Sequence, residues 1–274
     1  MTRRTVLNVS STKKRDTMLN VTNTDNSGAA TSGLTQTQAV VNGGNGGVFL
    51  WNGTARNLYL PGSTSINYKS YQAARSATTC YMVGLKERIR LTSNSGVAWI
   101  WRRICFTEKG LSFSAIAAGD NTPTGNYELY HEDPNNAGMR RLLFNTAVAS
   151  LPNTQNRNMD IIFRGTSGVD WDNYITASTD PQRISVKYDK TITFRSGNSS
   201  GTIREFTRWM PMKHNLVYDD DENGKAEFGN YFSSFGRSGM GDYYVLDIIQ
   251  PSTGSAASDL LAFSVNSTLY WHEK

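Results

Sequence analysis

Strict alternation of apolar and polar residues constrains the fold of this chain more than any other feature. The clearest run is residues 81–91. One side of this run is mainly apolar, interrupted by Glu87, and holds Tyr81, Val83, Leu85, Ile89 and Leu91. The other side holds Met82, Gly84, Lys86, Arg88 and Arg90. Because successive side chains of a strand point to opposite faces, we expect a half-buried strand with a basic stripe outside.

Similar runs recur along the chain and are separated by loops rich in Gly, Asn and Ser. Residues 183–195 alternate over so great a length that we expect them to fold back near Asp189 and Lys190. Residues 97–106 are apolar on both sides, which indicates a strand covered on both faces. Further candidates are 16–22, 47–51, 160–165, 203–210, 243–249 and 268–271. Eight or nine short strands of this kind predict an all-β sandwich or barrel.

One segment reads as a helix. In residues 134–151, apolar or tolerated residues recur near i, i+3, i+4, i+7 and i+8, at Met139, Leu142, Leu143, Thr146 and Ala147. Pro152 is expected to end this helix. A single short helix inserted between strands leaves the class all-β.

Positive charge is concentrated at one end. The chain has 28 Lys and Arg against 23 Asp and Glu, a net charge of +5. Residues 1–15 contain no acid and five basic residues, which are Arg3, Arg4, Lys13, Lys14 and Arg15. We therefore expect a basic arm over residues 1–15 and a single neutral domain over residues 16–274. Such an arm suits a polyanion, although a solvated disordered tail has the same composition.

The sequence lacks the motifs of the common catalytic, phosphate-binding and metal-binding sites. Cys80 and Cys105 lie in apolar runs and are predicted to be buried, reduced thiols. There is no phosphate-binding Gly-rich loop, no nucleophile elbow, and no paired histidines or cysteines at metal-ligand spacing, so we expect neither an enzyme nor a cofactor or metal. No apolar run suits a signal peptide or a membrane span.

Residues 219–224 form an acidic run whose interpretation stays open. Asp219, Asp220, Asp221 and Glu222 lack the alternating spacing of a calcium loop. The run is interpreted as a solvated acidic turn, with an acidic patch facing a neighbouring subunit as the alternative.

Three stretches resemble known proteins. Residues 6–19 (VLNVSSTKKRDTML), 241–248 (GDYYVLDI) and 268–274 (TLYWHEK) resemble genomovirus capsid proteins. Residues 206–218 (FTRWMPMKHNLVY), with Glu222 and an aromatic run to Phe235, are more distantly similar to geminivirus coat proteins. Family members usually begin with a longer arginine-rich arm than the one here.

The resemblance implies an eight-stranded antiparallel jelly-roll sandwich, which assembles with copies of itself into a small icosahedral T=1-type shell around circular single-stranded DNA. It implies a virion protein that passes through the host nucleus during assembly, with Lys13, Lys14 and Arg15 as a possible signal for a nuclear import factor. We expect the arm residues to contact phosphates non-specifically. Weaker candidates for the same role are Lys86, Arg88, Arg90, Arg102 and Arg103.

Two other functions deserve comparison. A jelly-roll carbohydrate-binding module would need exposed aromatic rings, which Trp99, Trp101, Trp171, Trp209 or Trp271 could supply, although core packing explains these residues more simply. A glycoside hydrolase would need two paired carboxylates. Nothing in the sequence pairs the available ones, which are Asp160, Asp170, Asp172 and Glu205.

Overall fold

Strands dominate the structure. The computed structural model describes the protein except residues 1–8, 61, 64, 122–126, 128 and 134–137. In chain order the elements are β1 (Thr12–Met18), β2 (Asn20–Thr24), β3 (Ala30–Thr35), β4 (Ala39–Asn42), β5 (Gly47–Asn52), β6 (Thr79–Ser93), β7 (Trp99–Glu108), β8 (His131–Asp133), β9 (Gly138–Leu143), α2 (Pro152–Ile162), β10 (Ser185–Phe194), β11 (Thr202–Val217), β12 (Asp221–Asn223), β13 (Ala226–Phe228), β14 (Asp242–Pro251) and β15 (Leu260–Glu273). The prediction of an all-β protein with a short helix is confirmed.

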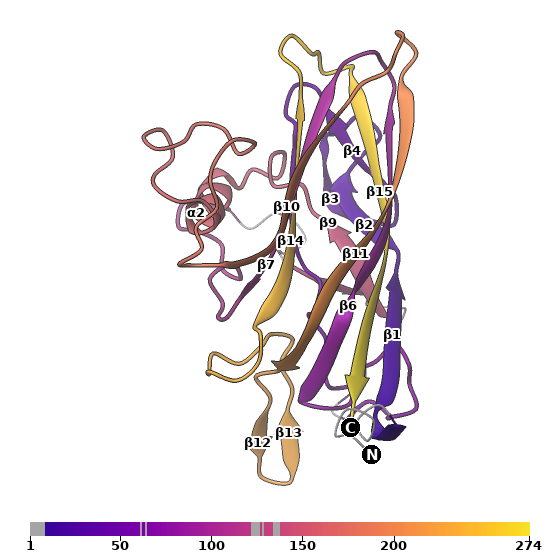
Figure 1. Cartoon of the computed structure of the whole chain (residues 1–274), viewed down its shortest axis with the longest axis vertical. Helices are drawn as coiled ribbons and strands as arrows, with labels where there is room; N and C mark the ends of the chain where they lie inside the picture. The colour runs from indigo at the N-terminus through magenta and orange to yellow at the C-terminus, as the bar shows by residue number, and fades with distance from the viewer. Residues whose placement is uncertain (1–8, 61, 64, 122–126, 128, 134–137) are drawn as a thin grey trace.

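Two sheets of long antiparallel strands form the body. The first sheet has the order β1-β15-β6-β11, and β4 pairs with the other end of β15; the second sheet has the order β10-β7-β14-β5. Aromatic rings meet between them: Trp101 of β7 lies 5.5 Å from Phe206 of β11, and Phe49 of β5 lies 5.6 Å from Phe263 of β15. The two sheets therefore pack face to face around a shared apolar core, with their strands along the long axis of the molecule (Figure 1).

The outer faces of the two sheets differ. On the second sheet β7 is almost wholly buried, which confirms that residues 97–106 are covered on both sides. Figure 1 shows α2 and its loops on this side, and the Arg102 guanidinium donates to backbone carbonyls of Tyr174, Ile175 and Ala177 there. On the first sheet, every second residue of β15 is buried and the others stay partly exposed. Its outer face thus remains open to solvent in the described chain.

Two smaller units complete the fold. β3, β2, β9 and β8 form a third sheet, in which β2 and β9 are parallel. β12 and β13 form a hairpin that projects beyond one end of the body, at the bottom of Figure 1. Residues 221–223 of the acidic run form β12 itself and are exposed, so this part of the run is a solvated segment, although it is a strand and not a turn.

The predicted helix at 134–151 is wrong. Residues 138–143 form strand β9 instead, and residues 134–137 lie outside the described part of the chain. β9 is buried along most of its length, and a short strand with buried residues on both sides can mimic helical spacing over so few residues.

Helix α2 begins where the predicted helix was expected to end. Pro152 occupies the first turn, where the missing N–H costs nothing and the fixed φ suits a helix. The Asp120 carboxylate accepts hydrogen bonds from the backbone N–H groups of Asn153 (3.2 Å) and Thr154 (2.6 Å), so it satisfies the free helix terminus from a distant loop. Because α2 continues to Ile162, the strand predicted at 160–165 is also wrong.

The strand at 81–91 changes phase near its start. The pairing of β6 with both neighbours shifts between Met82 and Gly84, which marks a bulge. Leu85, Glu87, Ile89 and Leu91 point inward as predicted, whereas Tyr81 is 40% exposed and Met82 is buried. The predicted inward position of Tyr81 is therefore wrong, because one extra residue turns the beginning of the strand over.

Other predicted segments are confirmed with altered bounds. Residues 185–194 form the single strand β10 with a bulge after Val186, so no fold-back occurs at Asp189. Residues 16–22 are divided at Leu19 between β1 and β2. Cys80 and Cys105 are buried free thiols, and burial raises the pKa of Cys105 to about 12, as expected for unreactive core residues.

Candidate nucleic-acid interface

The basic run at 13–15 lies in a strand and not in a free arm. Strand β1 pairs with β15 from Thr12 onward, so the predicted boundary at residue 15 falls within the folded domain. Alternation along β1 exposes Lys13 and Arg15 and buries Lys14. Arg3 and Arg4 lie outside the described residues. Of the three basic residues predicted to contact phosphates here, Lys13 and Arg15 therefore face solvent and Lys14 does not.

Lys14 is held by the end of the chain. Its ammonium Nζ lies 3.1 Å from a carboxylate oxygen of Glu273 and donates to the carbonyl oxygen of Ala74 (2.7 Å) and the hydroxyl of Ser76 (2.9 Å). Burial alone would raise the pKa of Glu273, but hydrogen bonds from Ser76 and Trp271 and the Lys14 charge outweigh it and hold that pKa below its ordinary value. This buried pair fixes β1 in register, which directs its neighbours outward.

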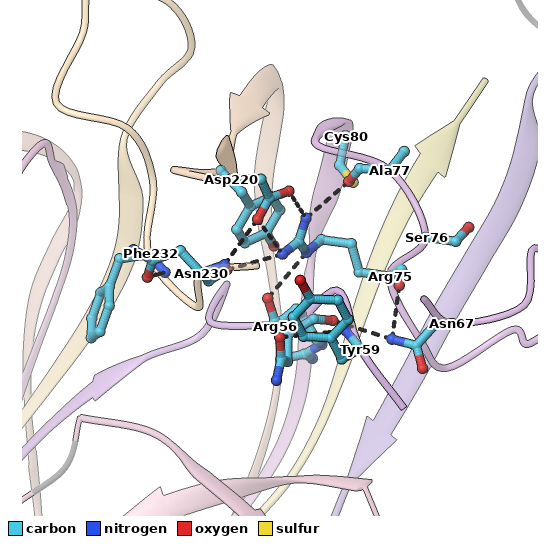
Figure 2. A network of polar contacts seen from close by, with 12 residues as sticks. Arg56, Tyr59, Asn67, Arg75, Ser76, Ala77, Cys80, Asp220, Asn230 and Phe232 are labelled. Atoms are coloured by element: carbon cyan, nitrogen blue, oxygen red, sulfur yellow. Dashed lines mark hydrogen bonds and ion pairs between the residues drawn. The ribbon is translucent and has the colours of Figure 1, made fainter. Parts of the chain in front are cut away.

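A second polar network anchors the loop that supplies Ala74 and Ser76. In Figure 2 the Arg75 guanidinium bonds the Asp220 carboxylate (2.9 Å from Nη2), and it also donates to backbone carbonyls of Arg56 and Asn230. The guanidinium carbon lies 3.8 Å from the centre of the Tyr218 ring. Asp220 is thus committed to a buried ion pair. The acidic run at 219–224 is therefore only partly solvated.

Lys86, Arg88 and Arg90 of β6 share the outer face of the first sheet with Lys13 and Arg15. The pairing of β15 with its two neighbours shows that these residues lie on one face. Thr268 pairs with Lys86 on one side and with Thr17 on the other, and Tyr270 pairs with Gly84 and with Arg15. We call this surface the basic face. It is defined by Lys13, Arg15, Lys86, Arg88 and Arg90.

The basic face carries a clear excess of positive charge. Among the described residues on the outward sides of its four long strands, Glu205 is the one carboxylate, and it lies opposite Arg90. Within the described chain no carboxylate comes within 4 Å of Arg15, Lys86, Arg88 or Arg90. Burial, and then the charge of Lys13, lower the pKa of His272 on the same face. An excess of cations on an open sheet attracts anions.

Arg102 and Arg103 have a different role. Arg102 lies on the covered side of the second sheet and pairs with Asp189 at 2.7 Å. Arg103 points into the core, where it pairs with Asp247 at 2.7 Å and with Glu87. Because their donors are already bonded and Arg103 is buried, these two residues do not belong to an exposed phosphate-binding surface.

Arg103 is part of a buried cluster of four charges. Arg141 of β9 joins Glu87 (3.0 Å) and Asp247 (2.8 Å), so two cations face two anions between the sheets. Burial would raise the pKa of Glu87, but Arg103 and Arg141 lower it below its ordinary value. Such a cluster is costly unless every member is bonded. Glu87, an acid on an apolar face, is the one member that the alternating pattern singled out; the other members come from distant segments.

Sequence reasoning also missed which tryptophan is exposed. Trp99, Trp101 and Trp271 are core residues and Trp171 is buried, as core packing predicted. Trp209 of β11 instead stands on the outer face of the first sheet, beside Lys86. Its ring meets that of Tyr270 at 5.9 Å in an edge-to-face arrangement. An aromatic pair, with Trp209 exposed and Tyr270 partly buried, thus lies among the cations of the basic face.

The structure offers little to the other chemistries. No group of three or more His, Cys, Asp or Glu side chains could hold a metal ion among the described residues. The carboxylates weighed for glycoside hydrolysis lie apart, since Glu205 is on the basic face while Asp160 is in α2 beside the other sheet. In the described part of the chain, no helix is long and apolar enough to cross a bilayer.

No protein-family model matches the chain, and a search of curated proteins finds no significant match.

Proposed function

We propose that the chain is a coat protein of a small single-stranded-DNA virus, of the genomovirus type, whose copies assemble into a closed icosahedral shell of T=1 type. Strand order supports this proposal. Leaving aside the short β4, the strands of the two large sheets, taken in chain order as first to eighth, are β1, β5, β6, β7, β10, β11, β14 and β15. In these numbers the order of the first sheet is first, eighth, third, sixth. The order of the second sheet is fifth, fourth, seventh, second.

This order supports a jelly roll, because the chain crosses repeatedly between the two large sheets and its first and last strands lie side by side. Jelly rolls occur in viral capsids and in lectins, so the fold by itself does not choose the function. The basic face favours the capsid. Five cations on one open sheet, against one carboxylate, suit the packaging of a polyanion without base-specific reading.

Self-assembly is the second part of the proposal. Repeated contacts of one kind between copies close a shell when the rotation between neighbours closes. The projecting β12–β13 hairpin and the loops at the ends of the sheets are the segments available for such contacts (Figure 1). The basic face would line the interior, and the arm that precedes Thr12 would extend the same charge.

The proposed import signal at 13–15 has less support in the folded chain. Lys14, the middle residue, is enclosed with Glu273 and cannot be read together with Lys13 and Arg15. Any import factor that binds the folded subunit would have to use other basic residues, and Arg3 and Arg4 remain candidates from the sequence.

The test is sedimentation with negative-stain imaging of the purified chain, and the 260/280 nm absorbance ratio of its heaviest fraction. The proposal predicts uniform closed particles whose ratio shows nucleic acid. A chain that stays monomeric across salt and pH would contradict it. In that case the alternative of a carbohydrate-binding module, with Trp209 and Tyr270 as its rings, becomes the better reading, and binding to an oligosaccharide array would test it.

A further inference from the structure

Trp209 is an exposed tryptophan on the open face of the first sheet, in its edge strand β11. Trp209 is 47% exposed although it lies within the 16-residue strand β11. Its Cα is the cross-strand partner of Lys86, a member of the basic face. Large aromatic rings on protein surfaces are frequently binding residues, because they offer a wide apolar contact at a small cost in side-chain entropy.

A glycine makes room for this ring. A Cβ at Gly84 would lie 2.7 Å from Cζ2 and 2.8 Å from Cη2 of Trp209, so the indole rests on the bare backbone of β6. Tyr270 is the partner of Gly84 on the opposite side, and its ring meets the indole edge-to-face with 62° between the planes. Backbone below and tyrosine beside it hold the indole in one orientation, so its position is fixed before any ligand arrives.

Cations surround the aromatic pair. Arg15 of β1 is the partner of Tyr270, and Lys86 is the partner of Trp209. Arg88 and Arg90 continue from Lys86 along β6. Alternate residues of a strand are about 6.8 Å apart, twice the rise of about 3.4 Å per stacked nucleotide in one strand. The charges are thus spaced for a strand of phosphates that runs beside the rings.

We propose that Trp209 and Tyr270 form a base-stacking platform through which the basic face binds single-stranded DNA, with Lys86, Arg88, Arg90 and Arg15 contacting the phosphates. Bases in a single strand expose their faces to aromatic rings, whereas a duplex hides them in its stack. The inference deepens the proposed function and rests on it for the identity of the nucleic acid as DNA. It adds that this surface distinguishes single strands from duplexes.

The test titrates the full chain, in the smallest species that sedimentation detects, with four ligands: the oligomer dT30, an abasic oligomer of the same length and charge, a duplex of 30 base pairs, and inorganic polyphosphate. The wild type should prefer dT30 to the abasic oligomer and to the duplex. Trp209→Ala should weaken dT30 binding about tenfold and leave polyphosphate binding unchanged. Trp209→Phe should restore part of the loss.

Two further variants sharpen the comparison. Thr207→Ala lies on the same face, opposite Arg88, and removes no ring, so it should bind dT30 as the wild type does. Gly84→Ala places a methyl group where the indole lies and should reduce dT30 affinity without removing any aromatic residue. Circular dichroism spectra and thermal unfolding of each variant verify that it is folded.

Three results would overturn the inference. These are equal binding of dT30 and the abasic oligomer by the wild type, a Trp209→Ala variant that loses polyphosphate and dT30 binding equally, and a preference for the RNA oligomer rU30 over dT30. The inference and the coat-protein proposal fail separately. Particle formation is scored by sedimentation and imaging and ring-dependent binding by titration, so a chain that forms no shell can still show ring-dependent binding, and a shell-forming chain can lack it.

Discussion

The ammonium group of Lys14 lies 3.1 Å from the carboxylate of Glu273, and both side chains are enclosed where the first and last strands meet. The pair joins residues 259 positions apart in the chain (273 − 14). It also sets the direction of the flanking cations, because a strand that buries Lys14 must expose Lys13 and Arg15. One buried ion pair therefore places part of the basic face.

Replacement of Lys14 by Met should destabilise the protein markedly. The variant leaves Glu273 buried with its hydrogen bonds to Ser76 and Trp271 but without a counter-charge. A buried ion pair that loses one partner typically costs about 3 kcal/mol or more. Urea denaturation should show a fall of that order in the free energy of unfolding. Lys225→Met, the same change at an exposed residue in the turn between β12 and β13, should alter it by less than about 0.5 kcal/mol.

Arg103 and Arg88 should behave in opposite ways. Arg103→Met leaves Glu87 and Asp247 with one cation, Arg141, in the core, so we expect a loss of about 3–5 kcal/mol in the free energy of unfolding. Arg88→Met, on the basic face, should leave stability nearly unchanged and weaken binding to dT30. Denaturant titration and fluorescence anisotropy measure the two effects. A stable Arg103→Met variant with weakened DNA binding would show that the burial of Arg103 is misassigned.

Asp242 should make stability depend on pH near neutrality. Burial raises its pKa from 3.8 to about 6, although Ser233 and Asn52 donate hydrogen bonds to it. Because the folded pKa lies above the unfolded one, this carboxyl contributes most to stability below about pH 4. That contribution declines as the pH rises through 6.

The Asp242→Asn variant tests this pH dependence, since the amide does not titrate. Whatever its constant cost, its free energy of unfolding relative to the wild type should rise by about 3 kcal/mol between about pH 4 and pH 7, because two pKa units correspond to that energy. Denaturation at both pH values measures the difference. The exposed Asp221→Asn in β12 is the control. A difference that is the same at both pH values would contradict the assignment.

The slope of log K against log salt for DNA binding should report how many cations of the basic face contact phosphates. For single strands, log K falls with log salt by about 0.7 for each phosphate contact. The double variant Arg88→Ala, Arg90→Ala should therefore reduce the slope by about 1.4, measured by anisotropy with dT30 over a range of NaCl. Lys187→Ala, an exposed cation on β10 of the other sheet, is the matched control. An unchanged slope in the double variant would place the phosphates elsewhere.

The period of two determined most of the fold class from sequence alone. Alternation at 81–91 and 268–271, and apolar residues on both sides at 97–106, correspond to β6, β15 and β7. These patterns are local consequences of strand geometry and of burial on one face or two, so no tertiary information is needed to read them. The stripe of Lys86, Arg88 and Arg90 was predicted to be outside for the same reason, and it is.

Local pattern failed where a distant residue decided the outcome. The helix begins at Pro152 because Asp120, over 30 residues earlier, caps it, and β9 occupies the segment where helical spacing had appeared. Arg103 was predicted to touch phosphates, since sequence shows its charge but not Asp247, which neutralises it across the sheet. A bulge beside Gly84 turned Tyr81 outward, and nothing in the alternation signals one extra residue.

The sequence by itself therefore determined the strands, their half-buried character and an excess of basic residues, because these depend on neighbours in the chain. The tertiary structure decided which cations are accessible. Lys14 and Arg103 became internal partners of Glu273 and Asp247, while Lys13, Arg15 and the β6 stripe came together with Trp209 on one open face. The physical reason is that sheet register joins residues up to 261 positions apart (273 − 12), and burial then selects which charges must be paired.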